Sequence, residues 1–167
     1  MEELDQESAQ IKEVYARYGL AMYQAQCVER EIAILLATVH GPGANRMTRA
    51  EYDELLDSLF RRVLGNLIRR LRDATSLRED FDTFLQETLE KRNWLAHNYF
   101  WERAGHFVTE EGRTMMLDEL TSIIAEFEEM DHSLHLINRE WAREHGVTEE
   151  IEQEALERII QQARGGV

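Results

Sequence analysis

A cation, an amide and an imidazole stand close together in the stretch "KRNWLAHNYFW", residues 91 to 101. They are Arg92, Asn93 and His97. Histidine gains and loses a proton near neutral pH, so it is the usual side chain for proton transfer in enzymes. Arginine carries a permanent positive charge and several donors for anionic oxygens. These residue types predict a site that moves protons beside a bound anion.

The stretch continues an amphipathic helix that we expect to begin near Ser76, which forms a capping box with Glu79. The apolar face of this helix consists of Phe81, Leu85, Thr88, Leu89, Leu95, Ala96 and Tyr99. Arg92 falls about 20° from the centre of that face, where an unpaired charge is strongly destabilising. Arg92 should therefore have a partner or face a cleft. Glu29 and Glu31 are candidate partners.

The other polar residues of the stretch lie beside this face. His97 and Asn93 are four residues apart, so they are neighbours on one flank of the helix. Trp94 and Trp101 point to a side that a monomeric bundle would leave in water, which predicts contact with a partner subunit or a stacking ligand. A purely structural alternative is that Arg92 forms an ion pair and His97 caps the end of the helix.

Helical periodicity covers most of the chain, and we find no repeat, low-complexity linker or alternating strand. Helices are expected at about residues 6–39, 48–74, 76 onward through the opening stretch, 109–143 and 148–164. Long helices with short connections pack as antiparallel neighbours. The predicted fold class is all-α: an antiparallel up-and-down helical bundle of four long helices plus a shorter fifth. It would form a single domain over residues 1–167.

Composition indicates a soluble, cytoplasmic protein. Hydrophobic residues make up 43% of the 167 residues, and Cys27 is the only cysteine, so no disulfide can form within the chain. The start "MEELDQES" has no apolar segment of a leader. The longest apolar run, "IAILLATV", is far shorter than the roughly 20 residues that span a membrane, so no membrane partner is expected.

The net charge of −14 argues against a nucleic-acid partner when it is taken alone. Residues 46–78 are the exception, because eight arginines against five acidic residues leave a local charge of +3. Helical periodicity places four of these arginines opposite the apolar side of their helix. This basic ridge consists of Arg61, Arg62, Arg69 and Arg72. It is the predicted RNA-binding surface if the partner is RNA.

The sequence "RNWLAH", followed by Asn98 and Tyr99, resembles the signature of the HEPN superfamily (higher eukaryotes and prokaryotes nucleotide-binding). Members of that superfamily carry an arginine, usually a polar residue next, and a histidine after a gap of four to six residues. Tyr99 also matches the "His, any residue, Tyr" extension of HEPN toxins that are paired with a minimal nucleotidyltransferase antitoxin. HEPN domains are small all-helical bundles with this motif near the end of a late core helix. The first-helix stretch "YGLAMYQAQCVEREIAILL" is similar to a HEPN opening helix.

This resemblance implies a metal-independent endoribonuclease, a toxin or defence component, that works as a homodimer with one composite active site across its interface. His97 would move protons during attack by a ribose 2′-hydroxyl, and Arg92 would stabilise charge on the phosphorane oxygens. Asn93 would orient the imidazole or the phosphate. Tyr99 is implied as the residue that a nucleotidyltransferase-type antitoxin would modify. The alternative is a non-catalytic HEPN-like dimerisation or binding module that regulates a partner protein.

A metal site is the last alternative. Glu129 and His132 have the spacing of a ferritin-type pair, and His132 with His135 could ligate a metal from one helix face. A di-iron bundle needs a second Glu-x-x-His, and the sequence has none. We therefore expect neither a metal nor another cofactor.

Overall fold

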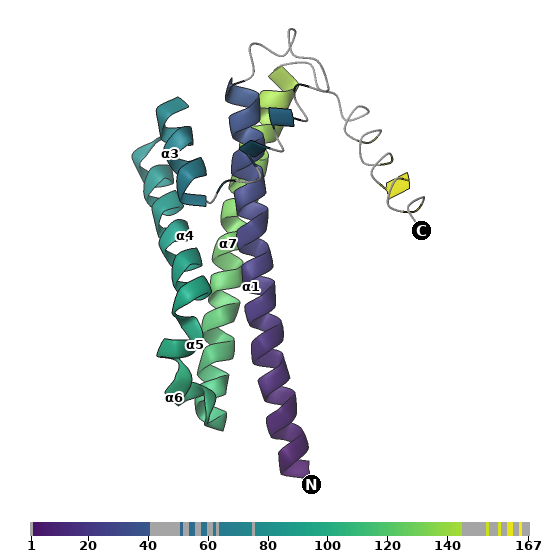
Figure 1. Ribbon diagram of the computed structural model, residues 1–167, viewed down its shortest axis with the longest axis vertical. Helices are drawn as coiled ribbons and strands as arrows, with labels where there is room; N and C mark the ends of the chain where they lie inside the picture. The colour runs from purple at the N-terminus through teal and green to yellow at the C-terminus, as the bar shows by residue number, and fades with distance from the viewer. Residues whose placement is uncertain are drawn as a thin grey trace.

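The computed structural model describes residues 2–40, 51, 54–55, 58–59, 62, 64–74, 76–144, 153, 157, 160–161 and 164, and most of them are helical (Figure 1). The all-α prediction is confirmed for these residues, since no strand occurs among them. The helices are α1 (Glu2–His40), α3 (Leu64–Ala74), α4 (Glu79–His97), α5 (Tyr99–Glu102), α6 (Ala104–Phe107) and α7 (Glu110–Glu144).

The two longest helices, α1 and α7, lie side by side and run in the same direction (Figure 1). Three hydrogen bonds join the two helices. In each of them the two partners are 104 positions apart in the sequence, and successive bonds are seven residues apart along each helix. They run from Gln10 to Thr114, from Arg17 to Thr121 and from Gln24 to Glu128. A constant difference between paired positions is the mark of a parallel pair, and the seven-residue step is the period of a coiled coil.

Helix α4 runs against both α1 and α7. Tyr18 of α1 bonds to Leu95, and Glu29, further along α1, pairs with Arg92, which comes earlier in α4. Later residues of α1 therefore meet earlier residues of α4, as in an antiparallel pair. The prediction of antiparallel neighbours is therefore confirmed for α4 but wrong for α1 against α7. The reason is that α4 to α6 return the chain to the end at which α1 began, so α7 starts beside the start of α1 (Figure 1).

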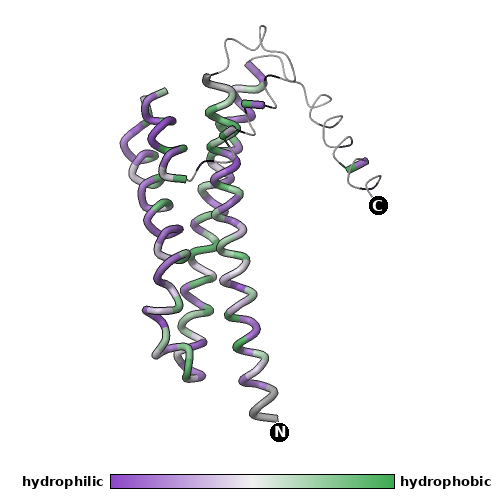
Figure 2. The backbone as a smooth tube through the Cα atoms, viewed as in Figure 1, coloured by the Kyte–Doolittle hydropathy of each residue, from purple (hydrophilic) through white to green (hydrophobic). Residues whose placement is uncertain are grey.

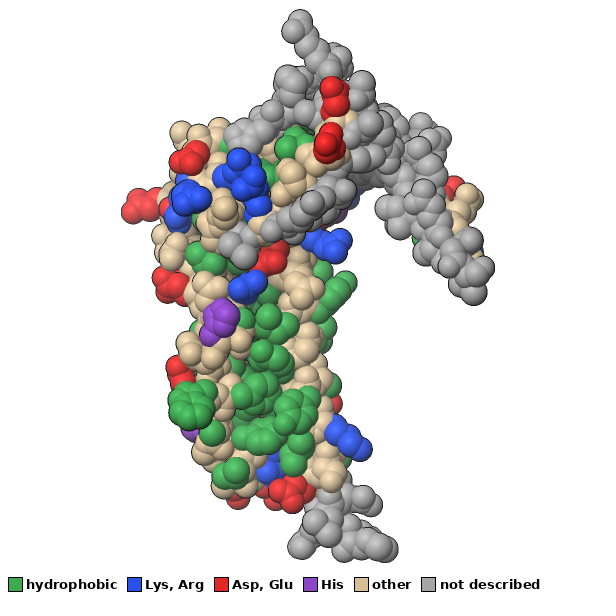
Figure 3. All heavy atoms as spheres, viewed as in Figure 1, with side chains coloured by type: hydrophobic (Ala, Val, Ile, Leu, Met, Phe, Trp, Pro, Cys, Tyr) green, Lys and Arg blue, Asp and Glu red, His purple; other side chains and the backbone are tan. Residues whose placement is uncertain are grey.

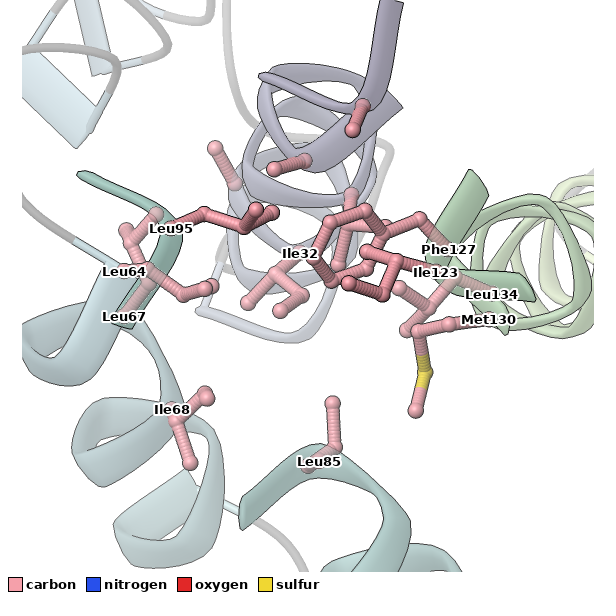
Figure 4. Close-up of a cluster of buried hydrophobic side chains, with 14 of the residues drawn as sticks. Ile32, Leu64, Leu67, Ile68, Leu85, Leu95, Ile123, Phe127, Met130 and Leu134 are labelled. Atoms are coloured by element: carbon pink, nitrogen blue, oxygen red, sulfur yellow. The ribbon is translucent and has the colours of Figure 1, made fainter. Parts of the chain in front are cut away.

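Apolar residues of α1, α3, α4 and α7 are buried together in one core. Figure 2 shows that hydrophobic positions recur along these helices between hydrophilic ones. Figure 4 shows how residues from all four helices meet in this core. The labelled side chains are Ile32, Leu64, Leu67, Ile68, Leu85, Leu95, Ile123, Phe127, Met130 and Leu134. Each is 3% exposed or less, and burial of a side chain of this size contributes about 1.5–3 kcal/mol. This core fixes the face of α4 that carries Arg92.

The helix that carries the site begins three residues later than predicted. Arg78 rather than Ser76 precedes its first turn, with no side-chain cap, and Asp80 accepts hydrogen bonds from Arg78 and from the Phe81 amide instead. Helix α7 starts one residue after the predicted Thr109, whose hydroxyl accepts a hydrogen bond from the Gly112 amide at 3.1 Å. That bond is a normal N-cap.

Two further predictions lie wholly or partly outside the described residues. The predicted helix over 48–74 is described in part, as α3, and the predicted helix over 148–164 is described at only five positions. The number of long helices therefore stays a prediction. None of the described helices combines the length and the apolar character that crossing a membrane requires.

Candidate active site

The three candidate catalytic residues lie in the last two turns of α4, as predicted. His97 is the last residue of the helix, and the backbone amide of Asn98 closes it with a hydrogen bond to the Trp94 carbonyl at 2.8 Å. His97 and Asn93 are exposed, whereas Arg92 is half-buried. The helix thus presents an imidazole and an amide to solvent and directs a guanidinium inward.

Arg92 forms an ion pair with Glu29 of α1, with Nη2 at 3.0 Å from Oε1. The two side chains are 22% and 20% exposed. The contact lacks good hydrogen-bond geometry, since Glu29 Oε1 is buried with no hydrogen-bond partner among the described residues. Burial raises the pKa of Glu29, and the Arg92 charge opposes that rise. The prediction that Arg92 needs a partner is confirmed, and the partner is one of the two carboxylates expected.

A cavity of about 260 Å³ lies beside this ion pair, between α1, α3 and α4. Arg92 and Glu29 line it together with Arg30, Gln26 and Arg62. Among the described residues of the wall, three arginines against one glutamate leave a net charge of +2 when Glu29 is ionised. The Nε atom of Arg62 is buried and has no hydrogen-bond partner in the described part of the chain. The cavity is therefore a positively charged space with a donor to offer.

Asn93 joins the cation to the flank that carries His97. Its Oδ1 accepts a hydrogen bond from Arg92 Nη1 at 3.1 Å, which holds the guanidinium from a second side. His97 is one helical turn from Asn93, so the two side chains are neighbours on the surface of α4. Within the described residues the His97 imidazole makes no hydrogen bond. It can therefore exchange protons with a ligand on this flank.

Tyr99 is packed in the core rather than presented to a partner. It is 1% exposed, and its hydroxyl donates a hydrogen bond to the Met116 carbonyl at 3.3 Å. Burial raises its pKa, with a further rise from Glu119 and a smaller opposing effect from Arg103. Transfer of a group to this hydroxyl would require local opening of the helix pair.

The two tryptophans have different surroundings. Trp101 is 86% exposed, and its place at an interface stays a prediction. Trp94 is half-buried within its own chain: its ring packs edge-on against Tyr99, and its Nε1 donates to Glu102 at 2.8 Å. Arg103 lies over the Trp94 ring at 5.0 Å. Only Trp101 therefore has most of its surface available to a partner.

An apolar surface lies on the same side of the molecule as the end of α4. Tyr15 of α1, 52% exposed, contacts the rings of Phe100 and Phe107. Figure 3 shows hydrophobic side chains gathered over the lower half of this face, while Lys and Arg side chains gather in the upper half. A charged upper half and an apolar lower half are typical of a surface that binds a partner.

The basic ridge does not form one continuous set. Arg61 lies outside the described residues. Arg62 lines the cavity, and Arg72 pairs with Asp82 at 2.5 Å. Arg69 is exposed on α3 and donates to Asn66. The structure therefore brings Arg62, but not the other described ridge arginines, to the candidate site.

The alternative metal residues do not converge. His132 and Glu129 are exposed, and His135 lies 3.6 Å from Glu31. In the described ranges no three His, Cys, Asp or Glu side chains are placed to hold a metal ion.

Gln26 and Arg30 were not predicted for the site, and Arg62 was predicted only for the outer ridge. A signal for Gln26 and Glu29 exists in the sequence. Gln26 follows Met22 by four residues and Glu29 follows Ala25 by four, so they are polar residues on an otherwise apolar stripe. Polar side chains in such positions usually face one another across a helix interface.

No known protein family, curated protein or solved structure matches the chain.

Proposed function

We propose that the protein is a metal-independent endoribonuclease of the HEPN type, a toxin or defence component of the cytoplasm. One observation carries this proposal. A half-buried arginine, an asparagine bonded to it and an exposed histidine occupy the end of one helix, beside a positively charged cavity. An anion-binding cation and a proton-transfer group are the two elements that cleavage of RNA by its own 2′-hydroxyl requires.

The chemistry assigns a role to each residue. The ribose 2′-oxygen attacks the adjacent phosphorus, the bond to the 5′-oxygen breaks, and the products are a 2′,3′-cyclic phosphate and a 5′-hydroxyl. His97 of one subunit accepts the proton of the 2′-hydroxyl, and His97 of the second subunit gives a proton to the leaving 5′-oxygen. Arg92 stabilises the charge on the phosphorane oxygens, and Asn93 holds the Arg92 guanidinium.

A homodimer follows from this mechanism, because two imidazoles are needed and each chain supplies one at this helix end. Trp101 and the neighbouring apolar surface support such a contact. RNA would approach along Arg62 and Arg69. For the whole chain we retain the expectation of four long helices, and for regulation that of a nucleotidyltransferase-type antitoxin acting on Tyr99.

A second function is favoured by the ion pair of Arg92 with Glu29. An arginine held by a carboxylate of its own chain is what we expect of a non-catalytic HEPN-like module that dimerises and regulates a partner protein. In that case the ion pair supports the fold, and Arg92 takes no part in chemistry.

The two functions are distinguished by RNA cleavage in EDTA. We expect wild-type protein to cleave a single-stranded RNA of mixed sequence, and His97→Ala to lose at least about 100-fold in rate, since general acid–base catalysis contributes about that much or more. His132→Ala is the matched control, because His132 is exposed on α7 and lies outside the cavity. If wild type and His97→Ala leave RNA equally intact while both are folded dimers, the regulatory module is the better account.

A further inference from the structure

The cavity between α1, α3 and α4 holds two buried polar atoms that make no hydrogen bond to the described residues. They are Glu29 Oε1, whose contact is the ion pair with Arg92, and Arg62 Nε, and both side chains line the same space. Buried polar groups are nearly always hydrogen-bonded in folded proteins, so a buried donor without a partner beside this carboxylate needs a reason. A ligand that accepts hydrogen bonds would satisfy Arg62, but it would compete with Glu29 for Arg92.

The size of the cavity limits that ligand. Its volume of about 260 Å³ is below the roughly 300–1,000 Å³ of pockets for drug-sized molecules. It equals about nine waters at roughly 30 Å³ each. A phosphate group with an attached sugar is small enough for such a volume.

The charge of the wall selects an anion. Arg62 and Arg92 come from different segments and line the cavity together, and guanidinium groups bind phosphate oxygens in pairs of hydrogen bonds. Among the described residues of the wall, Glu29 is the only carboxylate. Its contact with Arg92 is an ion pair without hydrogen-bond geometry, and its burial disfavours the charged form. A phosphate monoester carries about −1.5 to −2 charges near pH 7 and three acceptor oxygens, so it is a stronger ligand for Arg92 than this carboxylate.

We propose that this cavity is a binding site for a terminal phosphate group of a nucleotide or an RNA end, which Arg62 and Arg92 hold and for which Glu29 is the counter-ion that the phosphate displaces. Phosphate binding itself does not depend on RNA cleavage. The site shares Arg92 with the proposed ribonuclease centre. It rests on that proposed function only where the phosphate is taken to come from RNA. Binding is therefore measured on the His97→Ala background, where cleavage plays no part.

The test is a calorimetric titration of the full-length His97→Ala protein in EDTA at constant ionic strength. The probes are inorganic phosphate, adenosine 5′-monophosphate, and one short RNA prepared with either a 5′-phosphate or a 5′-hydroxyl. We expect Glu29→Gln to bind phosphate about tenfold more tightly, because it removes the competing charge and keeps the shape. Glu13→Gln is the matched control, with the same change on the same helix at an exposed site outside the cavity.

Arg62→Gln should bind phosphate about tenfold more weakly, and Arg78→Gln, at an exposed arginine outside the cavity, should not. If Arg62→Gln does not fold, Arg62→Lys serves instead, since it keeps the charge and removes the Nε donor. Tighter binding of the 5′-phosphorylated RNA than of the 5′-hydroxyl RNA identifies an RNA end, and tighter binding of the mononucleotide identifies a free nucleotide. Equal phosphate affinity in Glu29→Gln and its parent, or no binding by either, overturns the proposal. Loss of RNA cleavage has no bearing on this outcome.

Discussion

Arg92 of α4 lies 3.0 Å from Glu29 of α1 without hydrogen-bond geometry, and a cavity of about 260 Å³ opens beside the pair. The Arg92 guanidinium is better held by Asn93, which accepts its hydrogen bond at 3.1 Å. A tight structural ion pair would satisfy both charges, as Arg103 and Glu119 do with two hydrogen bonds at 2.6 and 2.9 Å. The looser contact of Arg92 is the arrangement expected of a cation that also binds a ligand.

The pH dependence of stability should reveal the buried carboxylate. Burial raises the pKa of Glu29 although Arg92 opposes it, and Arg30 and Arg62 also line the cavity. The folded protein therefore binds this proton more tightly than the unfolded chain does. The contribution of protonated Glu29 to the free energy of unfolding is lost as pH rises from the ordinary carboxyl pKa of about 4.3 through the raised pKa of Glu29 in the folded protein.

Glu29→Gln cannot titrate, so wild type should lose stability relative to this variant as pH increases through that interval. Urea unfolding at several pH values between 4 and 7 provides the measurement. Asp131, whose pKa burial also raises, is present in both proteins and cancels in the difference. Glu13→Gln should give a curve parallel to wild type. If stability depends on pH in the same way in Glu29→Gln and in wild type, the raised pKa of Glu29 is contradicted.

The connection between α6 and α7 depends on the absence of a side chain at Gly112. A Cβ atom there would lie 2.5 Å from His106 Cα and 2.6 Å from the His106 carbonyl carbon, and both are backbone atoms that cannot move aside. We expect Gly112→Ala to lower stability by at least about 2 kcal/mol, or about 4–8 °C in Tm.

Gly19→Ala is the matched change, because nothing lies within 4 Å of the added atom on exposed α1. It should raise stability by about 0.5–1 kcal/mol, since alanine is the better helix former. Thermal unfolding by circular dichroism checks both variants. A Gly112→Ala protein that melts with or above wild type would mean that this corner is packed differently.

Trp101 should contribute to the proposed dimer contact. Its side chain is 86% exposed on α5, and buried tryptophans are among the strongest contributors to protein interfaces. We expect Trp101→Ala to weaken dimerisation by at least about tenfold. Sedimentation velocity over a range of concentrations measures the change. Leu136→Ala on α7, where the side chain is 53% exposed, is the control that should leave the dimer unchanged. An unaltered dimer in Trp101→Ala would place the interface elsewhere.

Periodicity was sufficient to predict helices at α1, α4 and α7 and the anomaly at Arg92. The apolar residues of α4 recur at helical steps, so the inward direction of Arg92 and its need for a partner could be read from spacing alone. The partner could be limited to Glu29 or Glu31 but not chosen, because the choice depends on the rotation of α1 against α4.

The parallel pairing of α1 with α7 could not be predicted, because spacing within a helix does not report which of several neighbours it meets.

The place of Arg62 in the cavity could not be predicted either. Its periodicity placed it on an outer ridge, but the structure turns it into the cavity. Trp94 was expected at an interface, but contacts with Tyr99, Glu102 and Arg103 engage it within the chain.

The chemistry of cleavage tests the ribonuclease proposal most directly. Wild-type protein in EDTA is incubated with a single-stranded RNA and with a DNA of the same sequence, and the product ends are identified by mass spectrometry. We predict that the RNA is cut to fragments with a 2′,3′-cyclic phosphate and a 5′-hydroxyl, and that the DNA, which lacks the attacking 2′-hydroxyl, stays intact. An intact RNA, or cleavage of both strands alike, would contradict the proposal that His97 and Arg92 form a ribonuclease site.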